Sequence, residues 1–183
     1  MRQRLHSARD FYRTPRECVE LAKDLMDGSL RWWEPCAGDG AISSTLPQVT
    51  FASDIHPLKE GIDKLDILTC DKPDNVDAII TNPPFFAINE ILNRALFEWK
   101  IPILLLIRIE PLSTQKRNYF TKFISNMHIV SSLIKFTTED NRIVNGNGTM
   151  RCAWTLFNPI QQNQCITKWV VYDPLGIYKE RKT

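Results

Sequence analysis

The sequence predicts an α/β fold with a mostly parallel central sheet, helices on both faces and an antiparallel strand near the C-terminus. Segments with strand periodicity alternate with segments of helical periodicity along most of the chain. A nearly unbroken aliphatic run covers Ile101 to Ile109, as is typical of a central parallel strand that is buried on both faces. Strand-like segments dominate after this run, which predicts a strand-rich end.

The first predicted element is a helix from Thr14 to Gly28. We expect Thr14 to cap this helix, Pro15 to occupy its first turn and Glu17 to complete a capping box. Gly28 is expected to adopt the left-handed conformation that ends many helices. A short strand over Leu30 to Glu34 should follow.

A glycine turn and a brief helix are predicted next. The turn covers Cys36 to Gly40, and the helix continues through Ile42 and Leu46. A strand, a glycine turn and a helix in this order form the beginning of a βαβ unit. The second strand, Val49 to Ser53, runs into Asp54.

Further elements are predicted along the remainder of the chain. Val76 to Ile80 should form a strand, and a short segment at Asp66 to Leu68 precedes it. Apolar residues recur at helical spacing from Ile88 to Trp99, so one face of that helix should pack on the sheet. Another helix is expected after Ser113. The last two predicted strands are Ile129 to Phe136 and Cys152 to Phe157, which could pair around the polar loop 137–151.

Composition limits the classes of protein to consider. The chain has 183 residues, of which 43% are hydrophobic and 24% are charged, and its net charge is +2. We expect one domain over residues 1–183, and the charge decides nothing about nucleic-acid binding. No apolar run approaches the ~20 residues that span a bilayer. Because the N-terminus also lacks the apolar core of a signal peptide, we expect a soluble, intracellular protein without a membrane partner.

Neither disulfides nor a metal site are expected. The five cysteines are widely spread and form no C-x-x-C pair, so reduced thiols are predicted. His6, His56 and His128 share no spacing typical of metal ligands.

The candidate site lies where predicted strands end. Glu34 to Gly40, Asp54, Asp66 and Asn82 to Phe85 each follow a strand or lie near a strand end, and open parallel sheets bind ligands beyond these carboxyl ends. A lone glycine turn or a lone turn aspartate is an ordinary structural feature, so the prediction depends on their combined spacing.

The turn and the aspartates favour a nucleoside with a cationic arm. Glycines allow the backbone to approach a ligand closely, while Glu34 and Asp39 favour a cationic or amino-bearing group. Asp54 is placed to accept both ribose hydroxyls, and Asp66 could accept from an adenine amino group. S-adenosylmethionine is a nucleoside of this kind.

The segment Asn82-Pro83-Pro84-Phe85 is the most specific feature of the sequence. Its prolines remove two backbone donors and stiffen the turn. The Asn82 side-chain oxygen and the Pro83 carbonyl then form a pair of acceptors beside the flat ring of Phe85. This array suits an amino group on a planar ring: the acceptors orient its lone pair toward a methyl donor, and the aromatic ring stacks on it.

These motifs resemble those of class I, Rossmann-like S-adenosylmethionine-dependent methyltransferases that act on the amino group of adenine. Phe11 to Pro15 is similar to the F-x-T-P motif of that group, Glu34 to Gly40 to its donor loop, and Asn82 to Phe85 to its catalytic N-P-P-F motif. Their order resembles the gamma arrangement. The match covers residues 11–86 well and the remainder loosely.

The resemblance implies a role for each matching residue. Phe11, Thr14 and Pro15 would border the donor pocket, and Glu34 with its loop would lie near the methionine part. The full donor-binding set that it implies is Phe11, Thr14, Pro15, Glu34, Pro35, Cys36, Ala37, Gly38, Asp54, Ile55, Asp66, Ile67 and Asn82. The catalytic set is Asn82, Pro83, Pro84 and Phe85.

The chain also resembles the small stand-alone enzymes of bacteriophages and prophages, because 183 residues leave no room for a separate target-recognition domain. Candidate contacts to nucleic acid are Lys116, Arg117, Arg142 and Arg151. Lys116, Arg117 and Lys122 alternate with aromatic residues, and the favoured interpretation of that stretch is an amphipathic helix with solvated lysines. A homodimer or a partner that supplies target recognition remains open.

The expected function is therefore methylation of the N-6 amine of adenine in DNA, with the base flipped out of the duplex, in the cytoplasm of a bacterial or phage-infected cell. Adenine in RNA and the amide of a protein glutamine present similar amino groups, so both remain alternatives. A non-catalytic partner that only binds S-adenosylmethionine is a third alternative.

Overall fold

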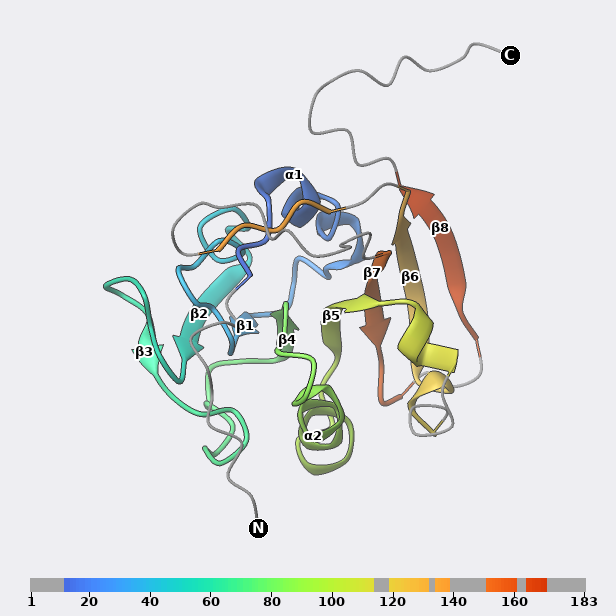
Figure 1. The fold of residues 1–183 in the computed structure, drawn as a ribbon. Coiled ribbons are helices and arrows are strands. Elements are labelled where there is room, and N and C mark those ends of the chain that lie inside the picture. Colours follow the sequence, from blue (N-terminus) through green and yellow to red (C-terminus); the bar gives the residue numbers. More distant parts are fainter. Residues whose placement is uncertain (1–11, 114–118, 132–133, 139–150, 161–163, 171–183) are drawn as a thin grey trace.

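The computed structural model describes residues 12–113, 119–131, 134–138, 151–160 and 164–170 and contains a mixed eight-stranded sheet (Figure 1). The strand order is β3-β2-β1-β4-β5-β7-β6-β8. The strands are β1 (Trp32–Glu34), β2 (Val49–Asp54), β3 (Asp63–Lys64), β4 (Ala78–Thr81), β5 (Ile103–Arg108), β6 (Ile124–Val130), β7 (Cys152–Phe157) and β8 (Ile166–Val170).

Most strand pairs in this sheet are parallel. The exceptions are the two pairs made by β7, which runs antiparallel to β5 and to β6. The outer strand β8 returns to a parallel pairing with β6. The predicted α/β class with a mostly parallel sheet is confirmed.

The order β3-β2-β1-β4-β5 follows the doubly wound arrangement. From β1 the chain builds outward to β3, and it then returns to the other side of β1 to form β4 and β5. The direction of growth therefore reverses between β1 and β4. Ligands of such sheets bind in the crevice beyond the carboxyl ends of the strands at this reversal.

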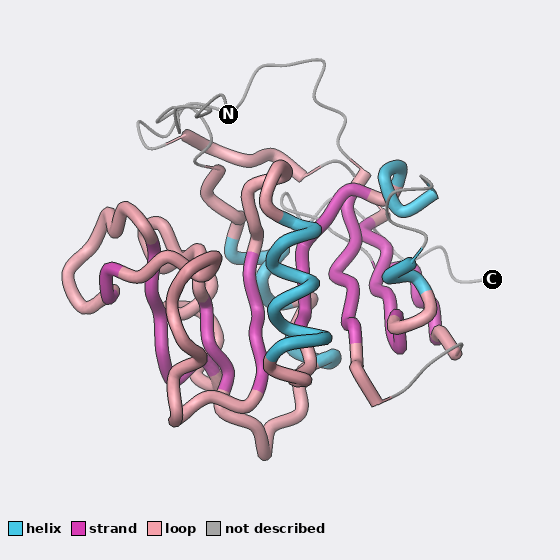
Figure 2. Tube along the Cα trace, turned by 90° about the horizontal axis from the view of Figure 1, so that it is seen from below, coloured by secondary structure: helices cyan, strands magenta, loops and turns pink. Residues whose placement is uncertain are grey.

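The helices are few and short. They are α1 (Arg16–Glu20), the 3-10 turn η2 (Lys23–Leu25), α2 (Ile88–Asn93), the π-helical turn η3 (Arg94–Glu98) and the 3-10 turn η4 (Glu110–Ser113). Figure 2 shows α2 and η3 as the longest helical run, beside the strands.

Two apolar clusters contain the neighbouring tryptophans of β1. Trp32 packs in a cluster with Cys18 and Val19 of α1. Trp33 packs in the other cluster, with Ile88 and Ile91 of α2. Successive side chains of a strand point to opposite faces of the sheet, so β1 contributes one tryptophan to each cluster.

The predicted helix 14–28 is broken into α1 and η2, so this prediction was wrong in its length. Thr14 does not cap it: Pro15 is the N-cap residue, and no side chain caps the helix. Gly28 does not have the positive φ that was expected at the end of this helix. The stretch contains Cys18, Val19 and Asp27, which are weak helix formers. After α1 the backbone forms a 3-10-type hydrogen bond from the Ala22 N–H to the Val19 carbonyl, at 3.0 Å.

The brief helix predicted after the glycine turn is also wrong, because residues 40–46 form a series of turns. Gly40 has φ +77°, which no right-handed helix contains. Hydroxyls compete for the backbone in this stretch: Ser43 donates to the Gly40 carbonyl at 3.4 Å and Thr45 donates to the Ala41 carbonyl at 2.8 Å.

In the C-terminal part, the predicted strand Cys152 to Phe157 is confirmed, whereas the predicted strand Ile129 to Phe136 was placed too late in the sequence. The strand β6 begins at Ile124, and its pairs with β7 run from Ile124 with Phe157 to Ile129 with Ala153. Beyond it, Ile134 and Phe136 pack in the cluster that contains α1. Their apolar pattern therefore reflects packing on that cluster, not an extension of the strand. Strand β8 was not predicted, and residues 114–118 of the helix expected after Ser113 lie outside the described residues.

Candidate functional site

Loops that follow β1, β2 and β4 meet an N-terminal segment at one edge of the sheet. The Ala37 N–H donates to the Ser53 carbonyl at 3.0 Å and the Leu58 N–H to the Gly38 carbonyl at 2.9 Å. These bonds join the loop after β1 to the loop after β2. Asn82, directly after β4, is hydrogen bonded to the N-terminal segment at Tyr12. The predicted motifs at the reversal point are therefore brought together.

The glycine turn after β1 needs its glycines for backbone shape. Gly38 has φ +55° and Gly40 has φ +77°, in the region that favours glycine. A Cβ atom at Gly40 would lie 3.1 Å from the Ser43 hydroxyl oxygen and 3.3 Å from Ile62 Cδ1. Any side chain at position 40 would thus strain the turn and crowd its neighbours.

Glu34 is a buried anchor of the turn. Its side chain is 1% exposed, and one carboxyl oxygen accepts the Ser43 N–H at 2.8 Å. Burial raises the pKa of this carboxyl to about 8, even though the hydrogen bond from Ser43 acts in the opposite direction. At neutral pH the folded protein therefore holds Glu34 largely in its protonated form.

Asp39 is paired with Arg13. The Arg13 guanidinium forms a close ion pair with the Asp39 carboxylate, and the Arg13 N–H donates to the Thr137 carbonyl at 2.8 Å. Glu34 and Asp39, which are predicted to favour a cationic or amino-bearing group, differ in state: burial keeps the Glu34 carboxyl neutral, and Arg13 balances the charge of Asp39. Arg13 joins the N-terminal segment to the glycine turn, a role that no local sequence signal indicated.

Asp54 ties two of the loops together. One carboxylate oxygen accepts the Gly38 N–H at 2.8 Å, and the other accepts the His56 N–H at 2.7 Å. A carboxylate oxygen has two lone pairs, so each oxygen retains one for a further donor. The residue is half-buried at the carboxyl end of β2, where the ribose contact was predicted.

The other predicted donor-binding residues near β1 and β2 lie close to Asp54. Burial, together with the nearby carboxylates of Asp54, Glu34 and Asp66, raises the pKa of the Cys36 thiol to about 12. These acidic side chains therefore surround Cys36, which has an inert, protonated thiol. Pro35 and Ala37 are buried, and Ile55 is half-buried.

Asp66 lies in a turn of its own. One carboxylate oxygen accepts the Leu68 N–H at 2.9 Å, as in an Asx turn. The neighbouring Ile67 is 4% exposed and belongs to the core cluster with Trp33. Ile67 therefore packs inward, while Asp66 is half-buried beside the site.

The orientation of Asn82 is fixed by the N-terminal segment. Its Nδ2 donates to the Tyr12 carbonyl at 3.3 Å and to the Thr14 hydroxyl at 3.1 Å. A carbonyl can only accept, so this contact determines which side-chain atom is nitrogen. Among the described residues, no donor is hydrogen bonded to the Asn82 Oδ1. Thr14 is 4% exposed, and its hydroxyl accepts a hydrogen bond from Asn82 instead of capping the helix.

Phe85 is stacked on an arginine that sequence reasoning missed. The guanidinium carbon of Arg108 lies 4.5 Å from the centre of the Phe85 ring. Arg108 is the last residue of β5, and in the sequence it was included in the aliphatic run Ile101 to Ile109 without a role of its own. Within the same loop Pro83 is buried, Pro84 is half-buried, and the Pro84 carbonyl accepts the Ala87 N–H at 3.0 Å.

The candidate nucleic-acid residues divide into described and undescribed positions. Arg151 is exposed, and its carbonyl accepts the Ile109 N–H at 3.1 Å, next to Arg108. It therefore lies at the same sheet edge as the site. Phe11, Lys116, Arg117 and Arg142 lie outside the described residues.

The stretch with alternating aromatic and basic residues packs mainly as a core element. Phe120 and Phe123 are 5% and 4% exposed, while Tyr119 is 58% exposed. These residues precede β6, whose first residue, Ile124, is aligned with Phe157 and thereby with Ile103, where β5 begins. The stretch therefore lies at the edge opposite the candidate site. Its buried phenylalanines agree with the favoured interpretation as an amphipathic element.

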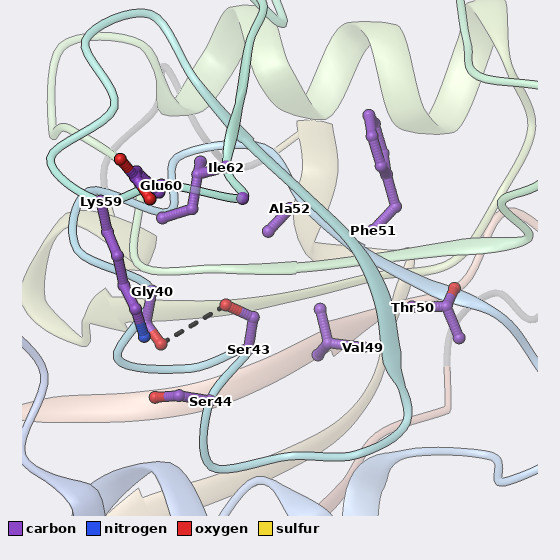
Figure 3. Close-up of a pocket in the computed structure, with 11 residues that line it drawn as sticks. Gly40, Ser43, Ser44, Val49, Thr50, Phe51, Ala52, Lys59, Glu60 and Ile62 are labelled. Carbon is purple, nitrogen blue, oxygen red and sulfur yellow. Dashed lines mark hydrogen bonds between the residues drawn. The ribbon is translucent and has the colours of Figure 1, made fainter.

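A shallow, open pocket of about 270 Å³ lies beside the glycine turn (Figure 3). Its lining includes Gly40, Ser43, Phe51, Lys59 and Glu60. The pocket shares the turn with the candidate site but includes neither Asp54 nor Asn82. Its volume is below the ~300 Å³ typical of small-molecule sites, so it carries no assignment.

In the part of the chain that the structure describes, no group of three or more His, Cys, Asp and Glu residues could hold a metal ion. No described helix has both the length and the apolar character needed to cross a membrane.

No protein-family model matches the chain, and no curated protein is significantly similar to it.

Proposed function

We propose that this protein is an S-adenosylmethionine-dependent methyltransferase that acts on the N-6 amine of adenine in DNA. In this proposal the sheet and its short helices form a Rossmann-like methyltransferase domain with helices on both faces. The protein would act in the cytoplasm of a bacterial or phage-infected cell, on a base that is flipped out of the duplex.

The orientation of Asn82 carries the proposal. Two acceptors, the Tyr12 carbonyl and the Thr14 hydroxyl, occupy its Nδ2. The side-chain oxygen is therefore left to accept a hydrogen bond from a substrate. No described donor is bonded to the Pro83 carbonyl either, so the two acceptors expected to hold an amino group are both available. Methyl transfer requires this polarity, because an amine held by acceptors keeps its lone pair free.

The residues at the reversal point fit the methyl donor, except that Glu34 takes a different role from the predicted one. Asp54 retains a lone pair on each oxygen for ribose hydroxyls, and Gly38 lets the backbone approach a ligand. Glu34 is too buried to reach a ligand freely. We propose that it holds the turn in shape, while the backbone of residues 36–40 contacts the amino-acid part of the donor.

When bound, S-adenosylmethionine would supply a methyl group that is carried on a sulfonium. Transfer of that methyl group to the amine nitrogen would break the carbon–sulfur bond and leave its electron pair on sulfur. Asn82 Oδ1 and the Pro83 carbonyl would accept hydrogen bonds from the two N–H groups of the amine, which directs the nitrogen lone pair away from both acceptors. One proton then leaves to solvent after transfer. Phe85 would stack on the ring that carries the amine.

The first test is nucleoside mass spectrometry on DNA, RNA and protein incubated with the purified chain and S-adenosylmethionine. We expect N-6-methyladenine in DNA only. Replacement Asn82→Ala should abolish methylation while donor affinity, measured by calorimetry, stays near the wild-type value, because the proposed role of Asn82 is toward the amine. Asn93→Ala, an exposed asparagine of α2, is the matched control and should methylate normally.

Different outcomes separate the alternatives. Methyladenine in RNA, or methylglutamine in protein, would retain the reaction and replace the substrate. Donor binding without any transfer would indicate a non-catalytic binder or a missing recognition partner. An equal loss of donor binding and transfer in Asn82→Ala would contradict the role given to Asn82.

A further inference from the structure

Two arginines at the candidate site differ from the other described arginines. Arg13, Arg16, Arg31 and Arg94 each form an ion pair, with Asp39, Glu20, Asp77 and Glu98 respectively. Among the described residues, no carboxylate pairs with Arg108 or with Arg151. The two described arginines without an acidic partner are therefore the two at the carboxyl end of β5.

The sheet brings the main chains of these two arginines together at this edge. Because Arg151 precedes the residue aligned with Arg108, the two side chains leave from opposite faces of the sheet. Arg108 is aligned with Cys152, the residue after Arg151, and the Ile109 N–H is bonded to the Arg151 carbonyl at 3.1 Å. In a paired antiparallel ladder, neighbouring strands are about 5 Å apart. The main chains that carry the two side chains thus meet directly beside the Phe85 loop.

Arg108 also carries an unsatisfied donor. Its Nε is buried and has no hydrogen-bond partner among the described residues, while the flat guanidinium rests on the Phe85 ring. A buried N–H group without a partner costs about 1–3 kcal/mol. The stacking on Phe85 orients the planar fork of donors, which is the geometry that binds phosphate oxygens.

The described charges at this corner sum to a positive value. Glu110 is the described acid whose charge acts on the nearby Cys152 thiol, and the charge of Arg108 acts there in the opposite direction. Among the described residues, one carboxylate therefore stands against the two guanidinium groups of Arg108 and Arg151. An anionic ligand is therefore favoured there over a neutral one.

We propose that Arg108 and Arg151 form a phosphate-binding edge that receives the sugar–phosphate backbone of a nucleic-acid strand beside Phe85. The inference rests on the proposed function for the identity of the strand as substrate. It adds that the enzyme selects a polynucleotide over a free nucleoside, because the cations contact phosphate while Asn82 and Phe85 contact the base.

The test measures binding of single-stranded and duplex DNA oligonucleotides by fluorescence anisotropy over a range of salt concentrations. Each phosphate contact adds about 0.7 to 0.9 to the slope of log affinity against log salt. Arg108→Gln and Arg151→Gln should each lower the slope by about that amount and weaken binding about five- to tenfold near 0.1 M salt. Their affinity for S-adenosylmethionine should stay unchanged.

Three comparisons keep the test interpretable. Lys100→Gln removes an exposed charge shortly before β5 begins, at the opposite edge, and should keep the wild-type slope. Arg108→Lys retains the charge without the planar fork, so it should keep most of the slope and lose substrate turnover. Thermal unfolding of each variant verifies its fold.

The outcomes for binding and for catalysis are separate. A double variant with the wild-type slope, or a wild-type protein that does not bind DNA, would overturn the phosphate-binding edge. A reduced slope in both variants together with no adenine methylation would support the edge and reject the proposed reaction.

Discussion

Among individual residues, Glu34 shows how position changes the chemistry of a side chain. The sequence presents it as an acid at the end of a strand, yet it is buried beneath the glycine turn and bonded to the Ser43 N–H at 2.8 Å. Its raised pKa reflects the loss of water around the carboxyl. A residue expected to attract a cation thus serves first to shape the loop.

This burial predicts a dependence of stability on pH. The pKa of Glu34 rises from 4.5 to about 8 on folding, so between these values the unfolded chain loses a proton that the folded protein keeps. Stability from this residue is fully present below the unfolded pKa and is lost as pH rises toward the folded pKa. Each pKa unit corresponds to about 1.4 kcal/mol.

Thermal unfolding of Glu34→Gln at about pH 5 and about pH 8.5 tests this linkage. The variant cannot ionise at position 34, so its melting temperature should fall less than that of the wild type between the two pH values. A difference of ~2–4 °C per kcal/mol is expected for a domain of this size. Glu60→Gln, at an exposed position, should follow the wild type. Parallel curves for Glu34→Gln and the wild type would show that Glu34 has no raised pKa.

At the scale of elements, Asp54 joins the ends of two parallel strands. Its carboxylate accepts one N–H from the loop after β1 and one from the loop after β2. The loop bond from Leu58 to Gly38 reinforces the connection. The donor-binding edge is therefore held together by main-chain donors converging on one aspartate.

Replacement Asp54→Ala should weaken binding of S-adenosylmethionine by about 1–3 kcal/mol, as expected when one partner of buried hydrogen bonds is removed. Titration calorimetry measures the loss. Asp63→Ala, which removes an exposed aspartate from β3, is the matched control and should bind normally. Unchanged affinity in Asp54→Ala would reject the ribose assignment.

Elements with a strong local pattern were predicted correctly, and contacts across the fold were not. The strand at Cys152–Phe157 and the helix that begins at Ile88 follow directly from periodicity. The bond from Asn82 to Thr14 spans 68 positions, so no local window contains it. Arg108 was missed for a related reason: its aliphatic strand gave no sign that a ring from another loop would lie on its guanidinium. A tertiary contact also changed the start of the predicted first helix, because Thr14 is engaged by Asn82 instead of capping it.

Over the whole molecule, a buried hydrogen bond links the N-terminal helix α1 to strand β7. The Trp154 indole N–H of β7 donates to the Cys18 carbonyl of α1 at 2.8 Å. Both residues are fully buried in the cluster that also contains Trp32. The C-terminal part of the sheet therefore fixes the N-terminal helix that follows Thr14.

Trp154→Phe should destabilise the protein by about 1–3 kcal/mol, because the Cys18 carbonyl would remain buried without a donor. Thermal or urea unfolding measures this change. Trp99→Phe is the comparison, because no hydrogen bond of the Trp99 indole N–H is found among the described residues. It should cost less. Equal losses would assign the effect of Trp154→Phe to packing volume alone.

The bond between Trp154 and Cys18 also bears on the order of events during synthesis. A ribosome adds ~5–20 residues per second, and Trp154 is made 72 residues after Asn82. The nascent chain therefore carries the Asn82 loop for roughly 4–14 s before the strand that secures α1 exists. The residues proposed to hold the amine are made early, but the N-terminal support of Asn82 is secured late. A ribosome stalled before β7 would hold a chain with every proposed catalytic residue and no finished sheet to position them.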